Sequence, residues 1–270
     1  MTPLLSGSAA KNMVFLGLLW NKTMKINWVR LRKWILQAVL FFFVSSLGLV
    51  LLYRFVPVPL TPLMVIRSVE SLGAEKFVGI DKDWVPLEDI SPSVQRAVLK
   101  AEDYRFFDHN GFDYDAIQKA MKFNQTHKRK KGASTISQQT AKNVFLWPYR
   151  DWVRKGFEAY FTVLIEFVWP KERIMEVYLN VIELGPGVYG VEAASQKYFK
   201  KTAKSLNPYQ ASLMAAVLPN PRKFRIDRPS IYVMARQRRI LNRVAPEIPK
   251  SADASLLDFL DLKFDSEDDE

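Results

Sequence analysis

The segment from Trp34 to Tyr53 carries no charged side chain and is almost entirely apolar. At about 1.5 Å of rise per helical residue, such a run reaches roughly 30 Å, the thickness of the hydrocarbon core of a bilayer. A cleavable signal peptide has a shorter apolar stretch followed by small residues, whereas the sequence RFVP follows here over residues 54–57. The sequence therefore predicts a membrane-spanning helix over residues 34–54.

The charge on either side of this segment predicts its orientation. Residues 1–33 contain six basic side chains and no acidic one. Because basic segments stay on the cytoplasmic side, the N-terminus should be cytoplasmic and the rest of the chain should lie across the membrane. The expected organisation is a basic arm (1–33), a transmembrane helix (34–54), a connector (55–84), a main domain (85–250) and an acidic tail (251–270).

The net charge of +11 and the absence of cysteine limit the chemistry. Without a thiol there is no cysteine nucleophile, cysteine-ligated metal or disulfide. A basic surface beside a membrane suits anionic lipids or a phosphorylated lipid substrate. Nucleic acid is the rival partner, but no nucleic-acid-binding module accompanies the charge, so we expect no nucleic acid.

Periodicity and capping residues predict a mainly α-helical domain. The Pro-rich segment 56–64 should be extended, and residues 71–90 stay ambiguous, with a short strand pair as one interpretation. Ser91 and Asp113 have the character of N-caps. Helices are expected over residues 91–102, 113–123, from 134 onward, 152–169, 170–185, 189–200 and 208–218.

The acid pair Glu102 and Asp103 follows an apolar helix and precedes an aromatic segment with Phe106, Phe107 and Phe112. Apolar surroundings raise the pKa of a carboxyl group and can make it a general base or acid. The alternative is that both are ordinary helix-end acids. His109 should fix a loop, since two histidines without paired spacing do not predict a zinc site.

Two further groups have the spacing of an anion site. Ser134, Gln138 and Lys142 are four residues apart, so they lie along one face of a helix near its N-terminus. Arg154, Lys155 and Glu158 share another helix face and could grip a diphosphate directly or through a divalent ion. The alternatives are a capping serine with a solvated lysine, and a surface ion pair of little energetic value.

Four segments in order resemble the peptidoglycan glycosyltransferase family, and in particular its monofunctional membrane-anchored members without a transpeptidase domain. They are EDYRFFDHNGFD (102–113), GASTISQQTAKNVFL (132–146), RKGFEAYFTVLIE (154–166) and YLNVIELGPGVYGVEAASQKYF (178–199). The segment ASLMAAVLPNP (211–221) is also similar to that family. The resemblance implies a lysozyme-like, mainly helical glycosyltransferase domain over residues 85–250.

The resemblance also implies an activity. It is the polymerisation of lipid II into β-1,4-linked glycan strands, by inverting transfer from a donor linked to undecaprenyl diphosphate. Glu102 would be the general base. Glu158 would be the second acid, acting through a divalent cation (Mg or Mn) or by orienting nearby cations. The remaining substrate-binding residues would be Ser134, Gln138, Lys142, Arg150, Arg154 and Lys155.

The same resemblance implies a place in the cell. The expected location is the bacterial inner (cytoplasmic) membrane, with the catalytic domain periplasmic and with cell-wall synthesis or division proteins as possible partners. Two other functions stay open at this point. A lytic transglycosylase or muramidase would need a catalytic acid but not Lys142 and Arg154, and a membrane scaffold would need none of these residues.

Overall fold

The computed structural model describes residues 27–73, 77–128, 130–149 and 151–245. The chain divides into two units, residues 1–49 and 50–270, which are treated separately below. Most of the predicted basic arm, the whole acidic tail and Arg150 lie outside the described residues.

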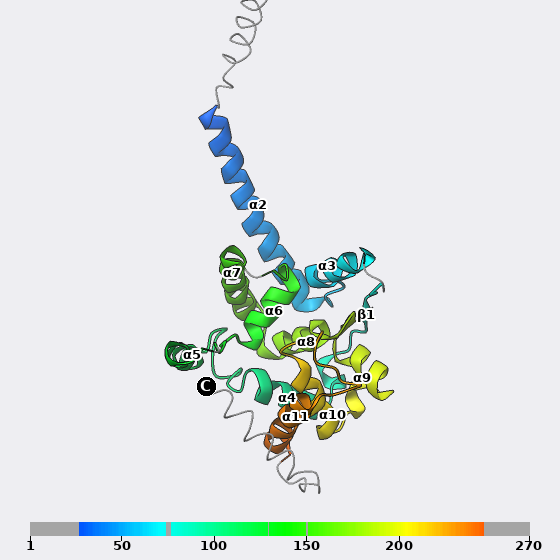
Figure 1. The fold of residues 1–270 in the computed structure, drawn as a ribbon. Coiled ribbons are helices and arrows are strands. Elements are labelled where there is room, and N and C mark those ends of the chain that lie inside the picture. Colours follow the sequence, from blue (N-terminus) through cyan, green and yellow to red (C-terminus); the bar gives the residue numbers. More distant parts are fainter. Residues whose placement is uncertain (1–26, 74–76, 129, 150, 246–270) are drawn as a thin grey trace, which may run out of the picture. The chain divides into compact units, whose positions relative to one another are not determined.

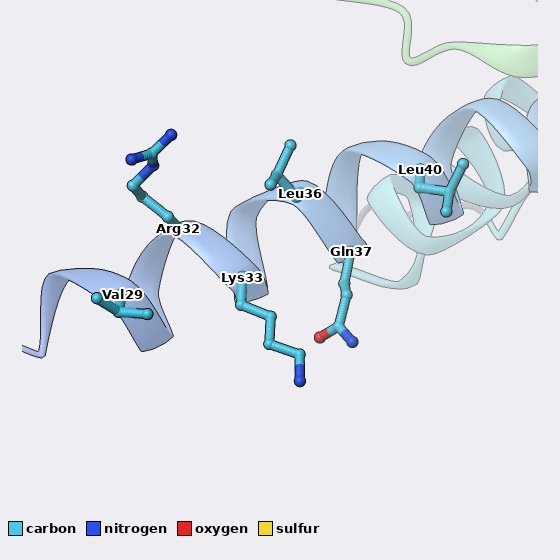
Figure 2. A pocket seen from close by; sticks show the side chains of 6 residues that line it. All are labelled: Val29, Arg32, Lys33, Leu36, Gln37 and Leu40. Atoms are coloured by element: carbon cyan, nitrogen blue, oxygen red, sulfur yellow. The ribbon is translucent and has the colours of Figure 1, made fainter.

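The first unit contains most of helix α2 (Trp28–Phe55), which is long and apolar enough to cross a membrane. The prediction of one long apolar N-terminal helix is thereby confirmed. The helix begins before residue 34 and includes the basic end of the arm. Figure 2 shows Arg32 and Lys33 projecting from its first turns, with Gln37 one turn beyond Lys33. The shallow hollow between these side chains is lined by this single helix and holds no acidic group.

The second unit begins with the last turns of α2, which are held by the helices of the domain. The indole Nε1 of Trp169 donates to the carbonyl of Val50 at 2.7 Å, and Arg54 Nη1 donates to the carbonyl of Val168 at 2.7 Å. Arg173 donates to the carbonyl of Tyr53 through Nε and Nη2, at 3.0 and 2.8 Å. Long-range hydrogen bonds therefore fix the start of the domain.

The segment expected to be an extended connector contains a helix, α3 (Pro62–Glu70), followed by the 3₁₀ turn η1 (Ser71–Gly73). The side chain of Thr61 accepts a hydrogen bond from the N–H of Met64, and Pro62 occupies the first helical position, where a missing N–H costs nothing. The prediction of an extended chain over residues 56–64 was therefore wrong beyond Thr61. The helix brings Arg67 into the domain.

A small sheet joins distant parts of the chain, with strands β1 (Asp81–Lys82), β2 (Glu183–Gly185) and β3 (Val188–Tyr189) in the order β1-β3-β2. Strand β1 pairs parallel to β3, and β2 pairs antiparallel to β3. Residues 71–90 were left ambiguous, with a strand pair as one interpretation; the described residues of this segment contain one strand, β1, which pairs with the distant β3. The helix expected to run to Gly185 ends at Val181, where β2 takes over.

Helices make up the rest of the described domain, and the mainly α-helical prediction is confirmed. Ser91, Asp113 and Asn207 cap their helices through side-chain hydrogen bonds. The elements are η2 (Leu87–Asp89), α4 (Pro92–Glu102), α5 (Tyr114–Thr126), α6 (Ile136–Phe145), α7 (Trp152–Val168), α8 (Lys171–Val181), α9 (Val191–Phe199), η3 (Ala203–Ser205), α10 (Pro208–Val217) and α11 (Ile231–Val244).

The helices pack as two groups (Figure 1). In one, α6 packs against α7 and α8; in the other, α4 packs against α10 and α11. The apolar residues of α8 are buried, including Ile174 and Tyr178. Glu102, the last residue of α4, lies where the two groups meet, because its partners belong to α6 and α11.

Candidate active site

Glu102 is held by one hydrogen bond to each carboxylate oxygen. Gln139 Nε2 on α6 donates to Oε2 at 3.1 Å, and Arg236 Nη2 on α11 donates to Oε1 at 3.3 Å. The Glu102 side chain is only 15% exposed. Burial raises the pKa of Glu102, and the hydrogen bond from Gln139 and the charges of Arg236 and Lys142 oppose that rise. A carboxyl group in this setting suits a general base.

The phenol of Tyr178 orients the amide of Gln139. Its hydroxyl donates to Gln139 Oε1 at 3.2 Å, which leaves the amide nitrogen directed at Glu102. Burial raises the pKa of Tyr178 well above its usual range, so the phenol stays a donor. Helix α8 thus fixes the position of Glu102 through α6.

The aromatic residues after Glu102 do not form the wall that the sequence suggested. Phe106 is buried, but its ring lies under the ammonium of Lys171, whose Nζ is 4.5 Å from the ring centroid. Phe107 is 56% exposed and cannot shield a carboxyl group. Glu102 ends α4, which packs against α10 and α11.

Helix α6 presents the predicted row of polar residues. Ser134, Gln138 and Lys142 all line a cleft of about 1040 Å³. The N-cap, however, is Thr135, which forms a capping box with Gln138. The alternative in which Ser134 caps this helix was therefore wrong, and Ser134 faces the cleft.

Glu158 forms a buried cluster with two cations on α7. Arg154 Nη1 donates to Glu158 Oε2 at 2.7 Å, and Lys155 Nζ donates to the other oxygen, Oε1. Arg154 and Glu158 are 8% and 3% exposed, so the surface ion-pair alternative was wrong for this pair. All three residues line the cleft.

The pKa of Lys142 responds to the charges of both Glu158 and Glu102. Burial lowers the pKa of Lys142; Glu158 opposes that shift, Arg154 and Lys155 add to it, and Glu102 opposes it. Burying an ammonium group among other cations destabilises the fold, but such a group binds a polyanion strongly. The cleft is therefore lined by the buried carboxylate of Glu158 and a set of cations, whereas Glu102 does not line it and is joined to it through Gln139.

The comparisons with known proteins agree with this geometry. The sequence profile of the transglycosylase family matches residues 71–245. The chain is 84% identical to the biosynthetic peptidoglycan transglycosylase of Bdellovibrio bacteriovorus, over 92% of this chain and 99% of that relative. It is 54% identical to the enzyme of the same description from Bacteroides thetaiotaomicron, over 79% of this chain and 86% of the relative. The corresponding protein of Caulobacter vibrioides is 50% identical, over 78% and 89%.

The chain belongs to the family of biosynthetic peptidoglycan transglycosylases. It is a peptidoglycan glycosyltransferase, and its general activity is the polymerisation of glycan strands. The lytic and scaffold alternatives are thereby set aside. The long apolar helix α2 is consistent with a membrane anchor.

The residues that the sequence placed near the site but not in it have structural roles in this transglycosylase. Asp103 is 5% exposed and interacts with His109 Nε2 at 3.1 Å, so His109 fixes the following loop as expected. Asp113 caps α5. Neither acid lines the cleft.

Three cleft residues of the transglycosylase were not predicted. Arg67 on α3, Glu183 on β2 and Arg222 in the loop after α10 also line the cleft. Burial raises the pKa of Glu183, and the charges of Arg67 and Arg222 oppose that rise. Glu183 lies within the YLNVIELG segment, so its position in a block of family resemblance was the available signal.

The divalent cation expected at Glu158 stays a prediction. Among the described residues, no cluster of three or more His, Asp or Glu side chains could hold a metal ion by itself. A Mg²⁺ ion that binds substrate phosphates needs only one or two protein carboxylates, and Glu158 could provide one. Both oxygens of Glu158 already accept hydrogen bonds from cations, so a metal would have to share or displace them.

Proposed function

We propose that this transglycosylase extends a glycan strand linked to undecaprenyl diphosphate, with lipid II as the acceptor. The 4-hydroxyl oxygen of lipid II attacks the anomeric carbon of the donor from the face opposite the diphosphate. The new C–O bond forms as the bond to the diphosphate breaks, and that oxygen leaves with the electron pair. The anomeric configuration inverts, giving the β-1,4 link.

Glu102 is the proposed general base, which accepts the proton of the attacking hydroxyl. The observation that supports this role is a largely buried carboxyl group with a raised pKa, which accepts a hydrogen bond from the cleft-lining Gln139. A base with a pKa nearer neutrality accepts a proton more readily than an exposed glutamate does.

The cations of α6 and α7 are the proposed diphosphate site. Lys142, Arg154 and Lys155 would stabilise the negative charge that develops on the leaving oxygen, an effect that is strongest in a poorly solvated site. Arg150 lies outside the described residues and is proposed for the same role by its place in the sequence. Ser134 and Gln138 would position the donor.

Glu158 is proposed to orient Arg154 and Lys155, since each of its oxygens is paired with one of them. A divalent cation, Mg²⁺ or Mn²⁺, would use Glu158 as its carboxylate ligand and would neutralise charge on the diphosphate. The roles proposed for Glu102 and the cations depend only on side chains of the chain itself.

The anchor and its orientation complete the proposal. The N-terminal arm would lie in the cytoplasm and the catalytic domain in the periplasm, where lipid-linked substrates share the membrane surface with the enzyme. Confinement to that surface raises the effective concentration of both substrates. Cell-wall synthesis or division proteins are proposed partners. Protease treatment of spheroplasts should remove the domain and spare the arm.

The test is glycan synthesis from labelled lipid II by the purified full chain, beside Glu102→Gln. The wild type should make polymer that a muramidase degrades, and Glu102→Gln should bind lipid II without extending it. Full activity of Glu102→Gln would overturn the assignment of the base.

A further inference from the structure

Arg236 lies in the middle of α11, outside every segment that resembles the family blocks. Its side chain is 25% exposed, and its Nη2 donates to Glu102 Oε1 at 3.3 Å. Its Nε is buried and has no hydrogen-bond partner in the described part of the chain. The contact with Glu102 is thus the one hydrogen bond that directs this guanidinium within the described residues.

The charged and titratable groups around Glu102 come from four helices. Asp103 follows it directly as the C-cap of α4, Lys142 lies on α6, Tyr178 on α8 and Arg236 on α11. Of the two cations, only Arg236 forms a hydrogen bond with the carboxylate. Gln139 holds the other oxygen and is neutral. Arg236 therefore provides the direct, charge-assisted contact with this carboxylate.

Like charges lie on the other side of Arg236. A small cavity of about 90 Å³ is lined by Lys100, Arg236, Arg239 and Arg243, and no acidic side chain lines it. Repulsion from these cations disfavours any turn of the guanidinium away from Glu102. The arrangement keeps Arg236 directed at Oε1.

We infer that Arg236 is a positioning residue for the general base, holding the Glu102 carboxylate in one orientation and in its ionised form at neutral pH. The inference rests on the proposed role of Glu102. A buried carboxyl group tends to keep its proton, and a protonated group cannot accept another from the substrate. Arg236 favours the ionised form by its charge, and it transfers no proton itself.

The experiment measures initial rates of polymer synthesis by the full chain from about pH 5.5 to 9. The variants are Arg236→Met, Arg236→Lys and a control, Arg96→Gln, which removes an exposed cation of α4 that lines neither the cleft nor the small cavity. Without the guanidinium, ionisation of Glu102 becomes less favourable, so the acid limb of kcat should move to higher pH. We expect Arg236→Met to lose at least about tenfold at the acid end and about threefold or less at the alkaline end.

The other readouts separate positioning from folding. Arg236→Lys should give an intermediate pH profile, and Arg96→Gln should follow the wild type. The KM for lipid II should change less than about twofold in each variant, because Arg236 does not line the cleft. Thermal unfolding of each variant shows whether the fold is kept. If Arg236→Met does not fold, the inference is tested by whether the acid limb of Arg236→Lys lies at higher pH than that of the wild type.

An equal loss of activity at every pH, or an acid limb that coincides with the wild type, would overturn the inference. The Glu102→Gln variant is measured alongside. If Glu102→Gln is inactive while Arg236→Met matches the wild type, only the role of Arg236 fails. If Glu102→Gln is active, the proposed base itself is wrong.

Discussion

The carboxylate of Asp103 accepts a hydrogen bond from the backbone N–H of Ile136 at 2.9 Å. This bond ties the end of α4 to the first turn of α6, because Ile136 is the first residue of that helix. The same carboxylate contacts His109, so it joins three segments. Two acids that are neighbours in the sequence thus have different roles: Asp103 joins segments of the fold, and Glu102 is the proposed general base.

Replacement of Asp103 by alanine should destabilise the domain without a specific effect on the chemical step. The N–H of Ile136 would lose its partner in a buried site, at a cost of about 2 kcal/mol. Chemical denaturation of Asp103→Ala should show this loss, and Asp103→Asn, which keeps an acceptor oxygen, should lose less. An unchanged midpoint for Asp103→Ala would contradict the structural role.

Replacement of Glu102 by glutamine should impair the chemical step without destabilising the domain. Polymer synthesis should fall by about 10²- to 10⁴-fold, the usual contribution of a general base. The fold should be kept, because the amide is isosteric with the carboxyl group and its oxygen can accept one of the two hydrogen bonds.

The difference in stability between Glu102→Gln and the wild type should change with pH in a defined direction. Because the pKa of Glu102 is raised in the folded state, its contribution to stability is full below the unfolded pKa and declines as pH rises through the folded value. The glutamine variant has no such decline. Relative to the wild type it should therefore gain stability on going from about pH 4 to pH 7, which thermal unfolding at both values measures.

Local signals predicted much of the fold. The caps Ser91 and Asp113 were predictable because each depends on residues within one or two turns. The spacing of four residues likewise predicted that Gln138 and Lys142 share a face of α6, whereas Ser134 lies before the N-cap Thr135 and lines the cleft from there.

The parts that were missed depend on contacts between distant residues. The bond between Arg236 and Glu102 joins positions 134 residues apart, and α11 carries many cations that obscure its apolar face. Strands of two or three residues have no usable periodicity, so β1 and its partner β3 were not predictable. The burial of Arg154 and Glu158 likewise follows from the packing of α7 on α6.

Removal of the Glu158 charge should weaken the diphosphate site by releasing its cations. With glutamine at position 158, Arg154 and Lys155 lose their common anion, and kcat/KM should fall by about 10- to 100-fold. The same rates are measured with and without a chelator. If orientation is the main role, the chelator changes the wild-type rate by less than about twofold; a loss as large as that of Glu158→Gln, restored by Mg²⁺ or Mn²⁺, would favour the metal.

Arg67 on α3 should contribute to substrate binding, because it lines the cleft. Its Nη1 is paired with Glu70 at 2.9 Å, and the hydroxyl of Tyr149 donates to the same carboxylate at 2.9 Å, so the guanidinium is held beside the cleft. Arg67→Gln should raise the KM for lipid II about three- to tenfold with little change in kcat, and less so at high salt.

The control for Arg67 is Arg225→Gln. Arg225 is also a cation of this domain, but it lines a neighbouring hollow and pairs with Asp227 at 2.6 Å. The KM of Arg225→Gln for lipid II should match that of the wild type at every salt concentration. Equal KM values for Arg67→Gln and Arg225→Gln would show that Arg67 does not bind the substrate.

Lys142 should set the alkaline limit of activity. Burial lowers the pKa of Lys142, so its ammonium loses its proton at a lower pH than an exposed lysine and the leaving diphosphate then loses a cation. Lys142→Gln should lower kcat by about 10²- to 10³-fold, the typical cost of losing one stabilising group in a desolvated site. Lys142→Arg should keep part of the activity, and its alkaline limb should move to higher pH because a guanidinium stays charged. The measurement is the initial rate of each variant across the alkaline pH range, with thermal unfolding as the check on folding. An alkaline limb that is the same in Lys142→Arg and the wild type would mean that another group titrates there.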